Sequence, residues 1–326
     1  SGNARTWSVH ARLQTPTAPT DVVTAFAAET TAGGRERRQI SIDGQPVRDR
    51  TRLAAAAGMI WLTPEMDRLF GEGPSARRRF VDRLVWGVDP AHAGRVGAYE
   101  RAMQQRSALL RRDRPDPAWL NAVEATIAEH AVAVAAARKQ AAAQLSAIAE
   151  AAADGFPGAI VGIRGTVEDW LDEAPALLAE DRLRAELVRC RDRDAQTGGA
   201  AIGPHRSDLS VLHAGHRRPA GMCSTGEQKM LLIALVLAGA RLQRRERGAS
   251  PLLLLDEVIA HLDERHRQAV FDAVAELAAQ AWYAGCDITP FRPLAGAAQM
   301  VSLDELHPSP ADDGDTDGPP EGHFDA

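Results

Sequence analysis

The sequence predicts an α/β fold that carries a long helical insertion, and three observations support this. Leu252–Leu255 is a wholly apolar run bounded by Pro251, typical of a central parallel strand buried on both faces. A helical segment (264–280) and a short strand (282–285) follow it, which makes a parallel strand–helix–strand unit. The stretch from Pro90 to Ala153 is rich in alanine and other helix formers, whereas the first 62 residues read as short strands.

In the N-terminal part, three segments alternate in polarity or carry β-branched residues: Trp7–Leu13, Asp21–Ala27 and Arg38–Ile42. Asp43-Gly44 then predicts a two-residue hairpin turn, because a type I′ turn needs positive φ at both central positions. We expect an antiparallel, partly exposed sheet. No strand, glycine-rich turn and helix stand ahead of it, so we also expect that an N-terminal segment is missing.

Prolines at 115 and 117 divide the alanine-rich stretch into two helices of about 22 and 36 residues. The longer one would reach roughly 54 Å, and the short connection predicts antiparallel pairing. A further helix is expected over Asp181–Asp194, ahead of Gly198-Gly199. A strand over Ser207–His213 and a helix over Glu227–Arg247 then lead into the apolar run.

The composition is that of an ordinary globular protein, with 45% apolar and 25% charged residues among 326. The formal net charge is −6, but six unpaired carboxylates in the last 19 residues account for it: Asp312, Asp313, Asp315, Asp317, Glu321 and Asp325. We expect this tail to be disordered and solubilising rather than a docking segment. The remaining body is near neutral, which neither suggests nor excludes nucleic-acid binding.

No apolar run approaches the roughly 20 residues that span a bilayer, and no basic-then-apolar leader is present, so a cytoplasmic location and no membrane partner are expected. Three widely spaced cysteines, Cys190, Cys223 and Cys286, indicate neither a disulfide framework nor a zinc site. We expect reduced and mostly buried thiols.

Asp256-Glu257 stands where the apolar strand ends, at the carboxyl edge of a parallel sheet where α/β folds bind ligands. One carboxylate there can hold a magnesium ion while the next polarises an attacking water. The alternative is an acidic helix N-cap that follows a core strand.

Ser224-Thr225-Gly226 lies directly before a predicted helix, so a hydroxyl, backbone amides and the helix N-terminus can converge on an anion. The alternative is a capping box of Ser224 with Glu227, three residues later. The two interpretations are compatible, because a capped helix start can also receive a phosphate.

The order of three motifs, Ser224-Thr225-Gly226-Glu227-Gln228, Leu252-Leu253-Leu254-Leu255-Asp256-Glu257 and His261-Leu262-Asp263-Glu264, resembles the signature, Walker B and D-loop of ABC-type ATPases. More narrowly, the chain resembles the RecF family over roughly residues 5 to 303. Three further stretches carry this resemblance: Leu62-Thr63-Pro64-Glu65-Met66-Asp67-Arg68-Leu69, Gly73-Pro74-Ser75-Ala76-Arg77-Arg78-Arg79-Phe80-Val81-Asp82 and Gly203-Pro204-His205-Arg206-Ser207-Asp208-Leu209. The resemblance implies an α/β ABC-type ATPase head, incomplete at the N-terminus, with an inserted helical arm domain.

The resemblance also implies function: an ATP-dependent DNA clamp that acts in recombinational repair and replication-gap processing, with heads that dimerise around ATP. Asp256 would take the magnesium (Mg2+), Glu257 would be the catalytic base, and Asp263 would contact the partner head. Ser224, Thr225, Gly226, Glu227 and Gln228 would bind the ATP held by the opposite copy. The implied partners are gapped or junction DNA, a second copy of the chain, and other recombination mediator proteins.

The chain departs from the family pattern in three places. Cys223 replaces the usual leucine before the signature serine, and Ala284-Gly285-Cys286-Asp287 stands where a threonine-containing switch is common. No Gly-x-x-x-x-Gly-Lys-Ser/Thr phosphate loop occurs, since the only lysines are Lys139 and Lys229. We therefore expect these 326 residues alone to bind ATP poorly.

Two arginine clusters are candidate DNA contacts. The first, Arg77-Arg78-Arg79, is predicted to bind phosphates, with solvated helix arginine as the alternative. For the second cluster, solvated arginine is the preferred interpretation: Arg241, Arg244, Arg245 and Arg247.

The expected domains are a β-rich partial N-terminal ATPase lobe (1–89), a helical arm (90–200), a C-terminal ATPase lobe (201–305) and the acidic tail (306–326). Two other functions stay open. One is a truncated, non-catalytic module that binds DNA or a partner. The other is a transporter ATPase subunit, which the helical insertion and the Gly-Pro-His-Arg-Ser-Asp segment disfavour.

Overall fold

The computed structural model describes residues 6–15, 18–27, 37–47, 58–112, 116–150 and 155–303. The chain divides into two compact units, residues 1–286 and 287–326. In the second unit the described element is a 3-10 turn, η3 (Thr289–Leu294). The acidic tail and the Pro115 break lie outside the described residues, so the expectation for the tail stays a prediction. Among the described residues, no helix is long and apolar enough to cross a membrane.

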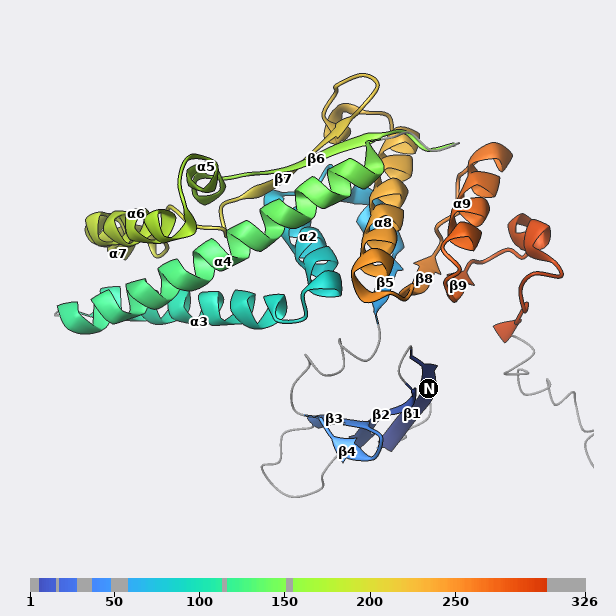
Figure 1. Ribbon diagram of the computed structural model, residues 1–326, viewed down its shortest axis with the longest axis horizontal. Helices are drawn as coiled ribbons and strands as arrows, with labels where there is room; N and C mark the ends of the chain where they lie inside the picture. Colours follow the sequence, from blue (N-terminus) through green and yellow to red (C-terminus); the bar gives the residue numbers. More distant parts are fainter. Residues whose placement is uncertain are drawn as a thin grey trace, which may run out of the picture. The chain divides into compact units, whose positions relative to one another are not determined.

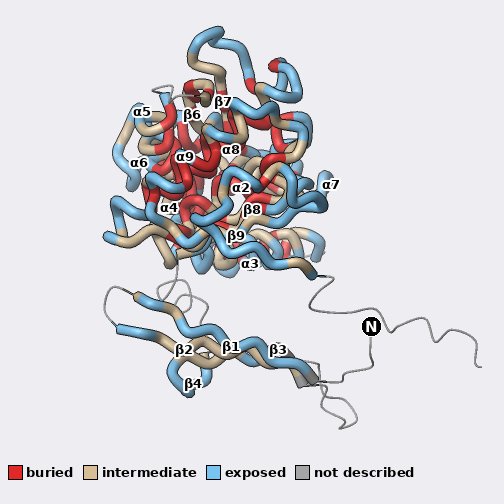
Figure 2. The backbone as a smooth tube through the Cα atoms, turned by 90° about the vertical axis from the view of Figure 1, so that its right-hand side faces the viewer, coloured by how far each residue is buried: buried red, intermediate tan, exposed pale blue. Residues whose placement is uncertain are grey.

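The N-terminal strands form the expected antiparallel sheet, in the order β1-β2-β3-β4. Its members are β1 (Thr6–Gln14), β2 (Pro19–Ala27), β3 (Arg37–Ile42) and β4 (Gln45–Pro46). Asp43 and Gly44 have φ of 50° and 74°, which confirms the predicted hairpin turn. None of the described residues in these strands is buried, as Figure 2 shows, so the sheet is at least partly exposed as predicted.

The predicted parallel sheet is present and has three strands, ordered β5-β8-β9. They are β5 (Met59–Leu62), β8 (Leu252–Asp256) and β9 (Ala281–Ala284), with helix α9 (Glu264–Glu276) between the last two. Strand β8 is central, as predicted, but only one face is fully buried: Leu253 and Leu255 are buried, whereas Leu252 and Leu254 are only partly covered. The expectation of burial on both faces is therefore wrong for the residues that the structure describes.

Helix α8 (Thr225–Arg247) is deeply buried, because every residue from Lys229 to Ala240 is covered. It packs beside β5 and the long helix α4 (Pro117–Ala149). A 3-10 turn, η2 (Ala220–Met222), leads into it, and another, η1 (Pro64–Arg68), follows β5. The antiparallel pair β6 (Ala159–Arg164) and β7 (Asp208–His213) lies beside α4 (Figure 1).

The helical part is built on the two predicted long helices, α3 (His92–Leu110) and α4 (Pro117–Ala149). They lie side by side and run in opposite directions (Figure 1). The predicted helix over Asp181–Asp194 is instead two helices that meet at Cys190. The remaining helices are α2 (Pro74–Val88), α5 (Thr166–Glu173), α6 (Ala176–Arg189) and α7 (Arg191–Thr197).

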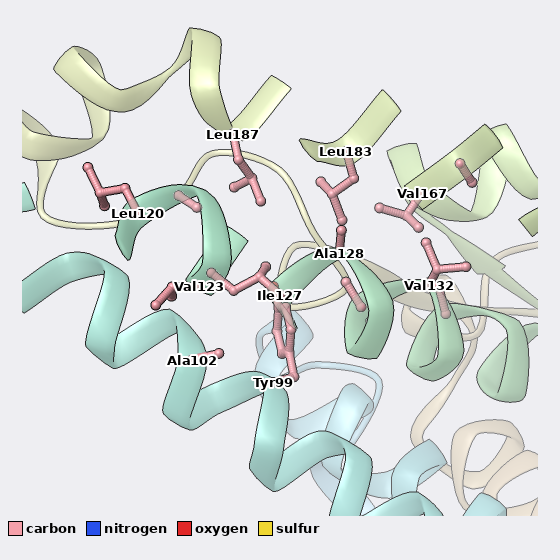
Figure 3. Close-up of a cluster of buried hydrophobic side chains, with 14 of the residues drawn as sticks. Tyr99, Ala102, Leu120, Val123, Ile127, Ala128, Val132, Val167, Leu183 and Leu187 are labelled. Atoms are coloured by element: carbon pink, nitrogen blue, oxygen red, sulfur yellow. The ribbon is translucent and has the colours of Figure 1, made fainter. Parts of the chain in front are cut away.

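The apolar core of this part lies between α4 and its neighbours. Figure 3 shows Ile127 of α4 beside Tyr99 of α3, and Ala128 facing Leu183 of α6. A buried arginine, Arg106, joins the same elements: it donates to Glu124 (2.9 Å), Asp194 (2.8 Å) and the Leu187 carbonyl (2.7 Å). Because all three contacts satisfy a buried cation, the arm is held as one packed unit.

Candidate functional site

The acidic pair stands at the carboxyl end of β8, as predicted. Asp256 is the last residue of the strand and pairs with Ala284 of β9. Its side chain is exposed, and no hydrogen bond or ion pair to it is found among the described residues. The helix-cap alternative is wrong for this pair, because α9 begins only at Glu264 and takes Asp263 as its cap. No contact within the described part of the chain therefore explains why a carboxylate stands at position 256.

Glu257 adopts a left-handed backbone conformation, with φ of 50°. A non-glycine residue there is strained, and such strain persists only where its surroundings hold it. Its N–H donates to the Ala284 carbonyl (3.0 Å), and its own carbonyl accepts from the N–H of Ala260 (3.1 Å). These two backbone bonds hold Glu257 at the carboxyl end of β8, directly after Asp256.

Two side chains that the sequence analysis did not select hold Glu257. Lys229 is buried, and its Nζ donates to the Glu257 carbonyl (3.2 Å) and to Asp67 Oδ2 (3.2 Å). The Cys286 thiol donates to Glu257 Oε1 (2.9 Å). That bond to Glu257 is the main reason why the pKa of Cys286 is raised, and a protonated thiol is the form that can donate.

A signal for Lys229 was present: one lysine directly precedes a long apolar run from Met230 to Ala240. A lysine on such a buried helix needs acceptors, because an unpaired buried charge is costly. The partners could not be read from the sequence, since Asp67 lies 162 positions away.

The start of α8 is exposed and carries the predicted capping box. Ser224 Oγ accepts from the Glu227 N–H (3.3 Å), and Glu227 Oε2 accepts from the Ser224 N–H (2.8 Å). The pKa of Glu227 is lowered mainly by that backbone bond and next by the Ser224 hydroxyl. Gln228 Nε2 donates to the Cys223 carbonyl (2.9 Å).

Neither a close contact nor the backbone conformation in the described structure requires glycine at position 226. A Cβ at this position would meet nothing within 4 Å, and its φ is not positive. Thr225 is also exposed, and no hydrogen bond of its hydroxyl is found in the described part of the chain. Three consecutive residues, 224–226, thus present a helix N-terminus and small side chains to the outside.

Asp263 is exposed and caps α9. Its Oδ1 accepts from the His266 N–H (2.9 Å) and lies 2.8 Å from His266 Nδ1. These contacts, the backbone bond first, lower the pKa of Asp263. Within the described residues, no polar contact joins Asp263 or the 224–226 segment to Asp256 or Glu257.

The arginines of the first cluster differ in their surroundings. Arg77 forms a bidentate pair with Asp208 (2.7 and 2.9 Å), and Arg78 donates to the Ser207 carbonyl (2.8 Å). Both therefore bind the Gly203–Leu209 segment. Arg79 is exposed and contacts only the Ser75 hydroxyl on its own helix (3.0 Å) among the described residues. Of the three, Arg79 is the guanidinium open to a phosphate.

Three arginines of the second cluster, Arg241, Arg244 and Arg245, line a hollow of about 360 Å³ near the ends of α8 and α9. Arg244 donates to the carbonyls of Glu276 (3.1 Å) and Leu277 (3.3 Å), and Arg241 lies 3.6 Å from the Glu276 carboxylate.

Cys190 and Cys223 are buried free thiols and Cys286 is an exposed one, as expected for reduced cysteines.

Comparison with known proteins identifies the family. The chain is 41% identical over 310 residues to DNA replication and repair protein RecF of Mesorhizobium japonicum, covering 94% of this chain and 81% of that protein. It is 44% identical over 271 residues to DNA replication and repair protein RecF of Rhizobium meliloti, covering 82% of this chain and 72% of that protein. No family model matches the chain.

Solved structures agree on the fold. One is described as the recombination mediator protein RecF with ATPrS in the RecFOR pathway; it has a TM-score of 0.76 at 16% identity, over 89% of this chain and 77% of that one. The corresponding RecF structure with ATP has a TM-score of 0.74 at 18% identity. The predicted α/β ABC-type ATPase head with an inserted arm is confirmed, and the chain belongs to the family of DNA replication and repair protein RecF.

Proposed function

We propose that this protein is a RecF-type DNA-repair ATPase whose nucleotide site forms between two copies of the chain. The observation that carries the proposal is Asp256, an exposed carboxylate at the end of the central strand with no partner among the described residues. The strained Glu257 next to it supports the same site. ATP, which two of the related structures contain, is the proposed ligand.

The residues present suit a magnesium ion. Mg2+ is bound through one or two carboxylates together with substrate phosphates, and Asp256 offers an unpaired carboxylate at the sheet edge where nucleotides bind. The ion would neutralise phosphate charge there. Glu257 would then orient and deprotonate the attacking water, with its backbone fixed by Lys229 and Ala284 and its side chain by Cys286.

The second half of the proposed site is the start of α8 from another copy. Open space at Gly226 lets a foreign phosphate approach the backbone amides, and Ser224 and Thr225 add hydroxyls. Glu227 and Gln228 shape this start through their bonds to Ser224 and Cys223. Asp263 would contact the partner head.

DNA is the proposed macromolecular substrate, in the form of gaps or junctions, and other recombination mediators are proposed partners. We assign phosphate contacts to the Arg77–Arg79 cluster, chiefly Arg79, because its guanidinium is exposed. Binding through phosphates falls steeply with salt, and flat salt dependence would contradict this assignment.

The test is ATP hydrolysis by the full-length protein. Glu257→Gln should lower kcat by at least about 100-fold while ATP still binds, since it removes a general base. Glu246→Gln, an exposed glutamate near the end of α8, is the matched control and should keep full activity. Unchanged hydrolysis in Glu257→Gln would overturn the assignment, and no hydrolysis by the unaltered protein would favour the non-catalytic module.

A further inference from the structure

A cluster of two histidines and a glutamate lies beside the start of α8. One ring nitrogen each from His213 and His216 and a carboxylate oxygen of Glu227 all lie within 4.8 Å of one another. Residues 213–216 end β7 and begin the turn after it, whereas Glu227 belongs to the first turn of α8. Three potential metal ligands from two elements thus converge on one point.

The backbone of the turn brings the two rings together. The Arg217 N–H donates to the His213 carbonyl (2.8 Å), and Arg217 has a φ of 54°. This tight turn folds His216 back over His213, with ring centroids 4.3 Å apart and an interplanar angle of 28°. The Gly215 N–H donates to His213 Nδ1 (3.1 Å), so an ion bound at this nitrogen would have to displace that bond.

The Glu227 carboxylate divides its two oxygens between two tasks. Oε2 accepts from the Ser224 N–H and hydroxyl, both at 2.8 Å, and this bond holds the side chain in place. Oε1 lies 3.7 Å from His216 Nε2, which is too long for a hydrogen bond. It is close to the roughly 3.4 Å that separates two ligands on a tetrahedral ion with bonds of about 2.1 Å.

We propose that His213, His216 and Glu227 bind a divalent transition metal ion, of which zinc is the best fit. Two imidazoles and one carboxylate suit Zn2+, Ni2+ or Co2+, whereas Mg2+ and Ca2+ prefer oxygen ligands alone. The His216 side chain is 60% exposed, so water can complete the coordination and the rings can shift by the small distance needed.

The bound ion would tie the turn after β7 to the first turn of α8. Glu227 would then be fixed by the ion through Oε1 and by Ser224 through Oε2, which fixes the exposed 224–226 segment as well. Metal binding here does not require nucleotide, so a failed titration leaves the proposed ATPase function untouched.

The test is a titration of the metal-free protein, without a histidine tag, with Zn2+ by calorimetry and with Co2+ by visible absorption. We expect one ion per chain, and at least about tenfold weaker binding in His216→Ala and in Glu227→Gln. His266→Ala is the matched control, because His266 also contacts a carboxylate, Asp263, but has no third ligand within the described residues. Its affinity should not change.

Three results would overturn the proposal. They are no saturable binding, equal affinity in the wild type and His216→Ala, or displacement of Zn2+ by Mg2+ at similar concentration. Any of them would leave His216 and Glu227 as an exposed ion pair only. A circular dichroism spectrum and an unfolding midpoint that match those of the metal-free wild type distinguish lost binding in His216→Ala from misfolding.

Discussion

Lys229 links two regions that are far apart in the sequence. Its side chain is 9% exposed and joins Asp67 of η1 to the carbonyl of Glu257, the residue with strained backbone. It follows the exposed 224–226 segment by one helical turn. We infer that Lys229 is a positioning residue, which holds Glu257 without touching nucleotide itself.

Replacement of Lys229 by methionine should lower the free energy of unfolding by about 2 kcal/mol, because the Asp67 carboxylate and the Glu257 carbonyl would lose a buried charged donor. Lys139→Met is the control: its Nζ also contacts a carboxylate, Asp172, and a backbone carbonyl, that of Glu168 (3.1 Å), but its side chain is 31% exposed and Asp172 is 71% exposed, so a loss of only about 0.5 kcal/mol is expected. Urea unfolding of both variants measures the difference. Equal losses would contradict a special role for Lys229.

At this scale, the sequence predicted residues whose task is local. The capping box of Ser224 and Glu227 follows from their spacing, and Asp256 follows from the end of an apolar run. Lys229 and Cys286 contact Glu257 although they lie 28 and 29 positions from it in the sequence. These contacts depend on tertiary packing, so no local sequence pattern predicts them.

At the scale of elements, the start of α8 has two separable tasks. The Ser224 hydroxyl caps the helix by accepting from the Glu227 N–H. In the proposed function it also contacts a phosphate of the ATP that another copy of the chain holds. A capping role needs only a hydrogen-bond acceptor at this position, whereas a nucleotide contact depends on the small hydroxyl itself.

Ser224→Ala should cost about 1 kcal/mol of stability, since an N-cap is lost, and Ser224→Asn should restore it. Thr225→Ala, at the next position, should leave stability nearly unchanged because no cap bond involves its side chain in the described structure. Thermal unfolding compares the three. If Ser224→Asn recovers stability but not ATP hydrolysis, the hydroxyl acts on nucleotide; recovery of both would reduce Ser224 to a cap.

Periodicity predicted the strong elements and missed those with mixed signals. The run Leu252–Leu255 and the alanine-rich helices were found because burial and propensity agree there. Helix α2 was missed within a lobe described as β-rich, although Gly73-Pro74 is a helix start with proline at N1. The break at Cys190 carries no glycine or proline, so no local pattern predicted it.

At the scale of the whole molecule, the family-specific stretches are explained in part by architecture. Arg77 and Arg78 of one stretch bind Asp208 and Ser207 of another. Asp82 accepts from Arg138 of α4 (2.7 Å), and Arg138 also donates to the Pro204 carbonyl (2.6 Å). These contacts hold α2, α4 and the segment before β7 together, and none of them involves Asp256, the half-buried Glu257 or the start of α8.

In the proposed function, the Asp256-Glu257 pair and the start of α8 complete one site only when two copies meet. In a symmetric dimer the acidic pair of each copy would face the α8 start of the other, which gives two equivalent sites. A protein that carries Gly226→Arg and one that carries Glu257→Gln should each be inactive alone. A heterodimer of the two retains one site with both halves intact.

The most direct measurement is therefore ATP hydrolysis by an equimolar mixture of these two variants of the full-length protein. With random exchange of subunits, the mixture should recover about a quarter of the wild-type rate, because half of the dimers carry one intact site out of two. A mixture with no more activity than either variant alone, while crosslinking confirms that subunits exchange, would contradict the shared site.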